Sequence, residues 1–366
     1  MASRDASDVI LRNDYRTRYI NYYSRQQGKY VVLNILGGSG AANEASEVTY
    51  LTMGRTQVTN EELVALNAVP AQPVQPPVIG VSTLYYNPLV TPISTVVTSN
   101  GVYMTDGTSL YNLSVGSVVS SPDGIRSLAV DPSGQLYIAS PSNIYRYTTG
   151  FSNLNITGLT NIATFAVATA FYIVEQGSST IFKALSNSAA TVIAGSTPGF
   201  ADGSPGKLKT PQGLTLDSTG QFLYIADTGN SLIRKMSTSV PYTLSTVAGS
   251  TTEFFNPFPT DSVGNRDGNG LNGETLLYSP QGITGSTTFY IADTANNNIR
   301  SLRDGNLTTI SGQSGTPPVY EFSPPGYTDA SLSLSLWTSP TSIFLYGSTL
   351  YVTEPANHAV RVIPLP

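Results

Sequence analysis

The sequence contains no cysteine, which excludes disulfides, zinc-thiolate sites and thiol nucleophiles. Because His358 is the single histidine, a metal site with several histidine ligands is excluded. The sequence around His358 shows no Ser or Asp partners for a catalytic triad. No apolar run is long enough to span a bilayer. The amino terminus, MASRDASD, shows no apolar segment typical of a secretion signal. The sequence therefore assigns the protein to no cellular location.

Glycine (33), proline (24) and tyrosine (22) are abundant, which favours many short strands and tight turns over helices. Residues 1–77 hold seven Lys/Arg and seven Asp/Glu, whereas the remainder holds 11 and 16, so the net charge of -5 lies beyond residue 77. The segment AQPVQPPV at 71–78 predicts an extended linker. We therefore expect an amino-terminal arm at 1–70, a linker at 71–78 and a main domain at 79–366.

One sequence pattern occurs six times in the main domain: an apolar strand, a turn of small polar residues and a second strand. The copies align on six tyrosines: Tyr103, Tyr137, Tyr172, Tyr224, Tyr290 and Tyr351. In most copies a further strand precedes this pattern and another strand follows it. Four antiparallel strands repeated 34 to 66 residues apart predict an all-β fold, a six-bladed β-propeller, because one small sheet cannot bury both faces until its neighbours stack around an axis.

The later copies resemble NHL repeats, which place Pro-x-Gly before the inner strand, an acid at the end of the second strand and an arginine on the third. These positions are Pro211, Gly213, Asp227 and Arg234, then Pro280, Gly282, Asp293 and Arg300, and in the sixth copy Pro340, Glu354 and Arg361, where Ser342 replaces the glycine. The resemblance covers residues 90–366 and is weak in the first three copies. The family usually builds six-bladed propellers, which agrees with the independent count of the copies.

The repeated acids and arginines are interpreted as structural. Asp and Asn at strand turns accept backbone hydrogen bonds, and an arginine seven residues later, on the adjacent strand, is well placed for a charge-assisted bond. The predicted pairs are Asp227 with Arg234, Asp293 with Arg300 and Glu354 with Arg361. A calcium or catalytic site would need several acids at one point, whereas repeats distribute them around a ring.

The chain ends just after the third strand of the sixth copy, so another segment must supply the outer strand. VIGVSTLYY at 78–86 has the length and β-rich composition to complete that blade and remove an exposed sheet edge. The alternative is that it packs elsewhere as an edge strand.

Long connections between blades are expected on the face that also carries the turns between second and third strands. Their aromatic residues are candidates for ligand recognition: Phe254, Phe255, Phe258, Tyr320, Phe322 and Tyr327. Packing over the channel mouth is the alternative. Trp337 matches the apolar positions of Leu208 and Leu277 and is expected in the core.

The arm shows an aromatic stripe at helical spacing with arginines beside it, formed by Leu11, Arg12, Tyr15, Arg16, Tyr19 and Tyr22. This pattern predicts a helix, followed by a strand at 29–36 and a short helix after a capping box at 59–62. The first 25 residues resemble the amino termini of structural proteins of large icosahedral DNA viruses.

The combined pattern predicts a non-catalytic structural or interaction protein, anchored by its arm to other protein subunits of an assembly such as a virion. A protein or glycan ligand is expected on the loop face, without cofactor or metal. The acidic propeller disfavours nucleic acid. The alternatives are a calcium-dependent six-bladed hydrolase and a soluble peptide- or glycan-binding module.

Overall fold

The computed structural model describes residues 80–121, 123–175, 177–250, 263–270, 274–313 and 323–366, together with the backbone of four strands between residues 10 and 52. The chain divides into two compact units, Met1–Pro77 and Val78–Pro366.

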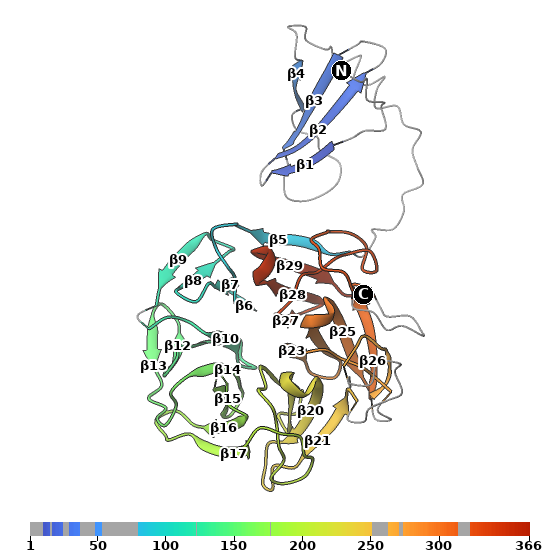
Figure 1. Cartoon of the computed structure of the whole chain (residues 1–366). Helices are drawn as coiled ribbons and strands as arrows, with labels where there is room; N and C mark the ends of the chain where they lie inside the picture. Colours follow the sequence, from blue (N-terminus) through green and yellow to red (C-terminus); the bar gives the residue numbers. More distant parts are fainter. Residues whose placement is uncertain are drawn as a thin grey trace. The chain divides into compact units, whose positions relative to one another are not determined.

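The larger unit is the predicted six-bladed β-propeller, with each blade an antiparallel sheet of at least four strands (Figure 1). Blade 1 contains β6 (Ser94–Thr98), β7 (Gly101–Thr105), β8 (Ser109–Asn112) and β9 (Ser117–Ser120). Blade 2 contains β10 (Ser127–Val130), β11 (Leu136–Ala139), β12 (Ile144–Tyr147) and β13 (Phe151–Asn153). Blade 3 contains β14 (Ile162–Val167), β15 (Phe171–Glu175), β16 (Thr180–Ala184) and β17 (Thr191–Gly195).

The later blades follow the same order. Blade 4 contains β18 (Gly213–Leu216), β19 (Phe222–Asp227), β20 (Leu232–Ser237) and β21 (Leu244–Ala248). Blade 5 contains β23 (Gly282–Gly285), β24 (Phe289–Asp293), β25 (Asn298–Arg303) and β26 (Asn306–Ser311), with a short fifth strand, β22 (Gly268–Asn269), on its outer edge. Blade 6 contains β27 (Ser342–Tyr346), β28 (Thr349–Glu354), β29 (Ala359–Pro364) and β5 (Ser82–Tyr86).

The strand β5 closes the ring, as the sequence predicted. It pairs antiparallel with β29, with Tyr86 opposite Ala359 and Tyr85 opposite Val360. In Figure 1 the light-blue β5 lies beside the red β29, which joins the start of the propeller to its end. The outer strand of blade 6 therefore comes from a segment that precedes blade 1.

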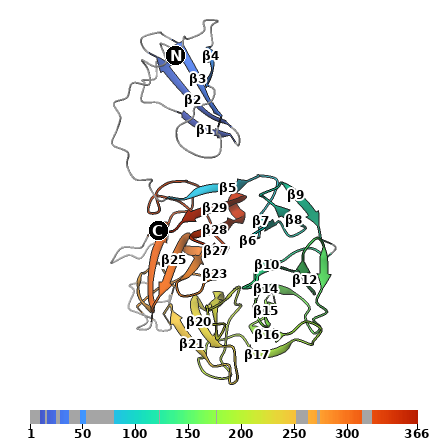
Figure 2. The ribbon, with the colours of Figure 1, turned by 180° about the vertical axis from the view of Figure 1, so that it is seen from behind.

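The first strands of the blades form the innermost layer and contact one another in the order β6, β10, β14, β18, β23, β27 and back to β6 (Figure 2). Neighbouring backbones come close here. A Cβ atom added to Gly213 would lie 2.2 Å from the carbonyl oxygen of Gln281, and one added to Gly282 would lie 2.5 Å from that of Thr341. The repeated glycine is thus required by the approach of the next blade.

The apolar core lies between adjacent blades. One cluster joins Val174 and Ile181 of blade 3 to Leu223 and Ile225 of blade 4, and similar clusters fill the following junctions. Trp337 is fully buried, as expected, and its Nε1 donates a hydrogen bond of 2.9 Å to Ser311 Oγ. Each blade is therefore stabilised by burial against its neighbours.

The smaller unit contains a four-stranded antiparallel sheet in the order β1 (Ile10–Asp14), β2 (Thr17–Ser24), β3 (Lys29–Leu36) and β4 (Val48–Thr52). The predicted strand at 29–36 is confirmed, but the helix predicted through the aromatic stripe is wrong. Leu11 and Arg12 lie on β1, and Tyr19 and Tyr22 lie on β2.

The helical spacing of the stripe was coincidental. Tyrosine, isoleucine and threonine dominate β2 and favour extended backbone, and the pair Asn13–Asp14, at the end of β1, favours a turn. The remaining stripe residues, Tyr15 and Arg16, and the capping box at 59–62 lie outside the described residues. No helix in the described part of the chain is both long and apolar enough to cross a membrane.

Candidate functional site

The turns between the second and third strands carry the repeated acids. In blades 4, 5 and 6 each turn is a single 3-10 turn: η1 (Thr228–Asn230), η3 (Thr294–Asn296) and η4 (Pro355–Asn357). The last residue of each donates its side-chain amide to the preceding acid, over 2.8 Å to Asp227, 2.8 Å to Asp293 and 3.0 Å to Glu354. The acid therefore fixes the turn that follows it.

The structure brings each of the three predicted acid–arginine pairs together in the interior. Arg234 Nη1 lies 2.9 Å from Asp227 Oδ2, and Arg300 Nη1 lies 2.6 Å from Asp293 Oδ2. In blade 6 the distance from Arg361 Nη1 to Glu354 Oε2 is 3.0 Å. All six side chains are fully buried.

A second acid, which the sequence analysis missed, completes each group. The blade-to-blade connections supply Asp202, Asp267 and Asp329, which lie 2.6, 2.6 and 3.0 Å from Arg234, Arg300 and Arg361. We call each set of two acids and one arginine an arginine cluster. The signal was present in the sequence, because each second acid precedes its arginine by 32 or 33 residues.

The second acid also binds the outer strand of its blade. Asp267 accepts hydrogen bonds from Thr309 N and Oγ1, at 2.9 and 3.0 Å, and Asp329 accepts two of 2.7 Å from Thr83. Asp202 accepts one of 3.2 Å from Thr246 Oγ1. Each arginine cluster thus ties the second, third and outer strands of one blade to the connection that precedes it.

Burial raises the pKa of the three inner carboxyls above their ordinary values, while the arginines and the hydrogen bonds act in the opposite direction. Their oxygens already accept bonds from the turn, the arginine and a backbone N–H, namely that of Lys209, Tyr278 or Thr338. The arrangement is that of buried architectural groups, which agrees with the structural interpretation of the repeats.

Among the aromatic residues predicted on the loop face, the structure describes Tyr327. Its hydroxyl lies 2.7 Å from Thr83 Oγ1, and its ring centroid lies 5.2 Å from the guanidinium carbon of Arg361. The side chain is 42% exposed and packs onto the arginine cluster of blade 6. The other five, Phe254, Phe255, Phe258, Tyr320 and Phe322, lie outside the described residues.

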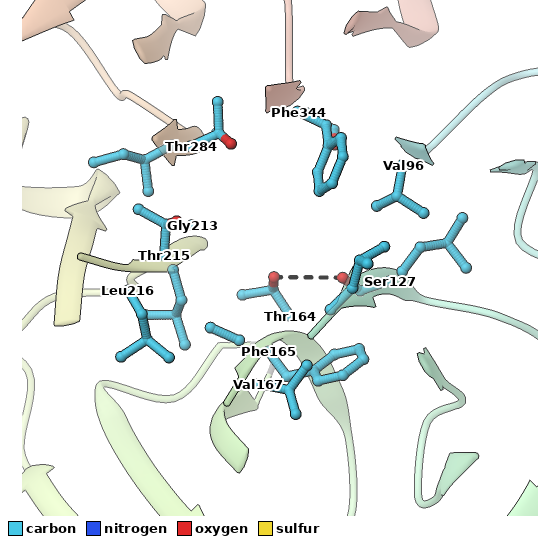
Figure 3. A pocket seen from close by; sticks show the side chains of 18 of the residues that line it. Val96, Ser127, Thr164, Phe165, Val167, Gly213, Thr215, Leu216, Thr284 and Phe344 are labelled. Atoms are coloured by element: carbon cyan, nitrogen blue, oxygen red, sulfur yellow. Dashed lines mark hydrogen bonds between the residues drawn. The ribbon is translucent and has the colours of Figure 1, made fainter. Parts of the chain in front are cut away.

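A cavity of about 770 Å³ lies along the central axis and is lined by the first strands of all six blades. Figure 3 shows hydroxyl side chains from four blades around it, those of Ser127, Thr164, Thr215 and Thr284. The ring of Phe344 reaches toward its centre. The volume falls within the range of small-molecule binding sites, roughly 300–1,000 Å³.

The hydroxyls around the cavity make few and long internal bonds. Ser127 Oγ and Thr164 Oγ1 are 3.4 Å apart, and Thr215 Oγ1 lies 3.4 Å from the carbonyl oxygen of Gly285. Thr284 Oγ1 accepts a bond of 3.1 Å from the backbone of Leu345, so its own proton remains available to another acceptor. The lining therefore offers donors and acceptors with little net charge.

Three charged residues line the cavity: Arg126, Asp131 and Asp217. Arg126 precedes β10, whereas Asp131 follows β10 and Asp217 follows β18. Because four antiparallel strands return the chain to the same face, all the first strands run in one direction along the axis. The arginine thus lies at the mouth on the loop face, and the two acids lie at the opposite mouth.

The acids at the far mouth are engaged in their own turns. Asp131 Oδ1 accepts bonds from the backbone of Ser133 and Gln135, and Asp217 accepts bonds from Thr219 and Phe222. Arg126, by contrast, is exposed and makes no side-chain hydrogen bond or ion pair with any of the described residues. It also lines an adjoining pocket of about 240 Å³, with Gln212 beside it.

His358 ends η4 in a left-handed conformation, with φ of 53°. Its Nδ1 lies 3.3 Å from both Thr91 Oγ1 and the carbonyl oxygen of Val90. In the described ranges, no three residues of the His, Asp or Glu type gather in a group that could hold a metal ion.

The chain matches no known protein-family model. Over 164 residues it is 28% identical to the human NHL repeat-containing protein 2, a match that covers 42% of the chain and 21% of that protein. The chain is thus similar to about one fifth of a known NHL-repeat protein. The comparisons do not show the viral resemblance of the leader.

The propeller is also similar to solved structures. An auxiliary nutrient binding protein from Bacteroides thetaiotaomicron superposes with a TM-score of 0.57 at 16% identity, covering 78% of this chain and 76% of that one. A putative phosphatase from the same organism gives 0.56 at 12% identity, with 98% of both chains covered. At these identities the similarity shows the fold alone.

Proposed function

We propose that the protein is a non-catalytic recognition module that binds a glycan carrying a carboxylate at the loop-face mouth of its central cavity. The observation that carries this proposal is the hydroxyl-lined cavity with one unpaired cation, Arg126, at its mouth. Hydroxyls that both donate and accept suit a polyhydroxylated ligand. An arginine fork suits a carboxylate, to which it can donate two parallel bonds.

The charges of the lining give the ligand a direction. An anionic group is attracted to Arg126 and repelled from the far mouth, where Asp131 and Asp217 lie. The uncharged part of the sugar would then extend inward along Thr164 and Thr284. The ring of Phe344 offers an apolar surface to the C–H face of a sugar.

The proposal is tested by NMR titration of the full chain with galacturonate and with galactose, a neutral sugar of the same ring configuration. We expect galacturonate to bind more tightly. Arg126→Gln should weaken galacturonate binding about tenfold, the effect of losing a charge-assisted hydrogen bond, and leave galactose unaffected. Arg146→Gln is the matched control, since Arg146 is an exposed arginine on β12 of the same blade and does not line the cavity.

Equal binding of the two sugars would refute the role of Arg126 but keep a glycan site. Thr164→Val should weaken both sugars, because it removes a cavity hydroxyl while preserving the side-chain shape. Binding of neither sugar would refute the glycan proposal.

We further propose that residues 1–77 attach the propeller to other protein subunits. The support for this is that residues 1–77 form a compact unit with a four-stranded sheet of its own. Replacing Tyr15, Tyr19 and Tyr22 by alanine should abolish assemblies larger than a dimer in sedimentation experiments and leave the melting of the propeller unchanged. A lower melting temperature of the propeller would instead indicate that the unit folds back on it.

A further inference from the structure

The outer strand of blade 1, β9, differs from the other outer strands in its exposure. All four residues from Ser117 to Ser120 are exposed, and the exposed fractions of Val118 and Val119 are 55% and 37%. Because successive residues of a strand point to opposite faces, each face of β9 presents a valine to solvent.

The edge of β9 that faces away from β8 has no strand partner among the described residues. Ser121 N donates to the carbonyl oxygen of Thr108, so Ser121 and Val119 turn their backbone groups toward the β8 side. Val118 and Ser120, which alternate with them, turn their N–H and C=O groups outward. These groups can form a further antiparallel ladder.

The outer edges of blades 4, 5 and 6 are covered by their own connections. Gly203 exchanges two backbone hydrogen bonds with Leu244 of β21, at 2.8 and 2.9 Å. In blade 5 the two-residue strand β22 pairs with β26. In blade 6 the carbonyl of Ala330 accepts a bond of 2.8 Å from Val81, next to β5. The molecule thus shows that the outer strand of a blade accepts one more antiparallel segment.

We propose that β9 pairs with β9 of a second copy of this chain, across a two-fold axis at Val119. In this register each Val118 lies opposite Ser120 of the other copy, and both residues turn their backbone groups outward, so two pairs form four hydrogen bonds. The two Val119 residues form a non-hydrogen-bonded pair at the centre, where the side chains of an antiparallel pair approach most closely.

The composition of the strand supports a second copy as the occupant. The segment 115–121, VGSVVSS, contains no charge that would be brought against its own copy. A two-fold interface uses the same patch on both subunits, and here the small serines flank the valine pair on each side. Because β9 contributes only four residues from each copy, the contact is small, and we expect the dimer at high protein concentration.

Sedimentation velocity of the full chain over a wide concentration range tests the proposal. We expect a monomer–dimer equilibrium for the wild type. Val119→Lys places two like charges opposite each other and should weaken dimerisation about tenfold or more. Val192→Lys is the matched control, because Val192 is an exposed valine on β17, the outer strand of blade 3, and it should leave dimerisation unchanged.

Charge complementation gives the second measurement. Mixing the Val119→Lys and Val119→Asp chains should restore the dimer, since opposite charges then face each other at the axis. Thermal unfolding of each variant verifies that the propeller is intact. A wild type that stays monomeric at all concentrations, a dimer unaffected by Val119→Lys, or mixing without restoration would each overturn the proposal.

Discussion

Blades 4 to 6 and blades 1 to 3 differ in the side chains that hold the turn between the second and third strands. In the later blades the second-to-third turn is held by an arginine cluster. In the earlier blades Tyr111, Tyr145 and Phe182 occupy the position of the arginine in the strand register, and the turn is held by neutral donors. Asp106, for example, accepts a bond of 2.7 Å from the hydroxyl of Tyr111, and Glu175 accepts one of 3.1 Å from Thr160 Oγ1.

The difference explains why the repeat is easy to read in one half of the propeller and weak in the other. A buried charge requires a fully specified set of partners, because removing one leaves the others uncompensated. A turn held by neutral or half-exposed groups tolerates several residue types. The sequence pattern is therefore strictest where the interior is most highly charged.

The largest expected effect concerns blade 6, whose arginine cluster accepts hydrogen bonds from Thr83 of β5. Deleting residues 1–77 should leave a propeller that unfolds cooperatively. Deleting residues 1–90 removes β5, exposes the edge of β29 and deprives Asp329 of Thr83, so we expect aggregation. Calorimetry and light scattering measure both chains, and identical behaviour of the two would contradict the closure by β5.

The next effect compares a buried and an exposed ion pair in one blade. Arg300→Met leaves Asp293 buried without its cation and should lower the free energy of unfolding by about 3–5 kcal/mol. The control is Arg303→Met, since Arg303 and Asp304 form a pair 3.6 Å apart with mostly exposed side chains. Its effect should stay within about 1 kcal/mol. Similar losses in urea unfolding would show that the cluster has no special importance.

A smaller effect is expected from the outer strand. Thr309→Val removes the hydroxyl bond to Asp267 and should cost about 1 kcal/mol in urea unfolding. The adjacent Thr308→Val is the control, because Thr308 Oγ1 is exposed and bonds only Ser301 Oγ, at 2.8 Å. If Thr308→Val lowers the free energy of unfolding as much as Thr309→Val does, the hydrogen bond from Thr309 to Asp267 does not stabilise the blade.

The smallest expected effect is on the pH dependence of stability, which should change in opposite directions for substitutions of Asp293 and Asp106. Because the pKa of Asp293 is raised in the folded protein, its contribution to stability is present below the unfolded pKa of about 4 and is lost as the pH rises through the folded pKa. Relative to the wild type, Asp293→Asn should therefore lose stability as the pH falls from 7 toward 4.

Asp106 behaves in the opposite way. Desolvation pushes its pKa upward, but the hydrogen bonds from Tyr111, Thr108 and Ser109 outweigh this and lower the pKa. Its contribution is present above the unfolded pKa and is lost as the pH falls through the folded pKa. Asp106→Asn should thus approach wild-type stability in acid. Urea unfolding of both variants measures these pH dependences. If the stability of the two variants, relative to the wild type, changed with pH in the same direction, the opposite pKa shifts of Asp293 and Asp106 would be refuted.

The sequence predicted the propeller, the number of blades and the closing strand because each depends on local alternation and repetition. Asp202 was missed because its partner, Arg234, is 32 residues away and the intervening connection has no regular pattern. Arg126 was missed as well, since only the closed ring shows that the residue before β10 lies at the mouth of a cavity. The helix predicted through the stripe from Leu11 to Tyr22 was wrong because a few aromatic residues at helical spacing cannot outweigh strand propensity.

The pairing of β5 with β29 also sets the order in which the chain can reach its final form. During synthesis β5 emerges before blades 1 to 5, yet its partner β29 follows them, and Tyr85 meets Val360 only when the 274 residues between them are present. Blades 1 to 5 can form from neighbouring segments as they appear. The final step is a long-range contact, which makes it slow relative to the rest and leaves the edge of β29 unprotected until β5 arrives.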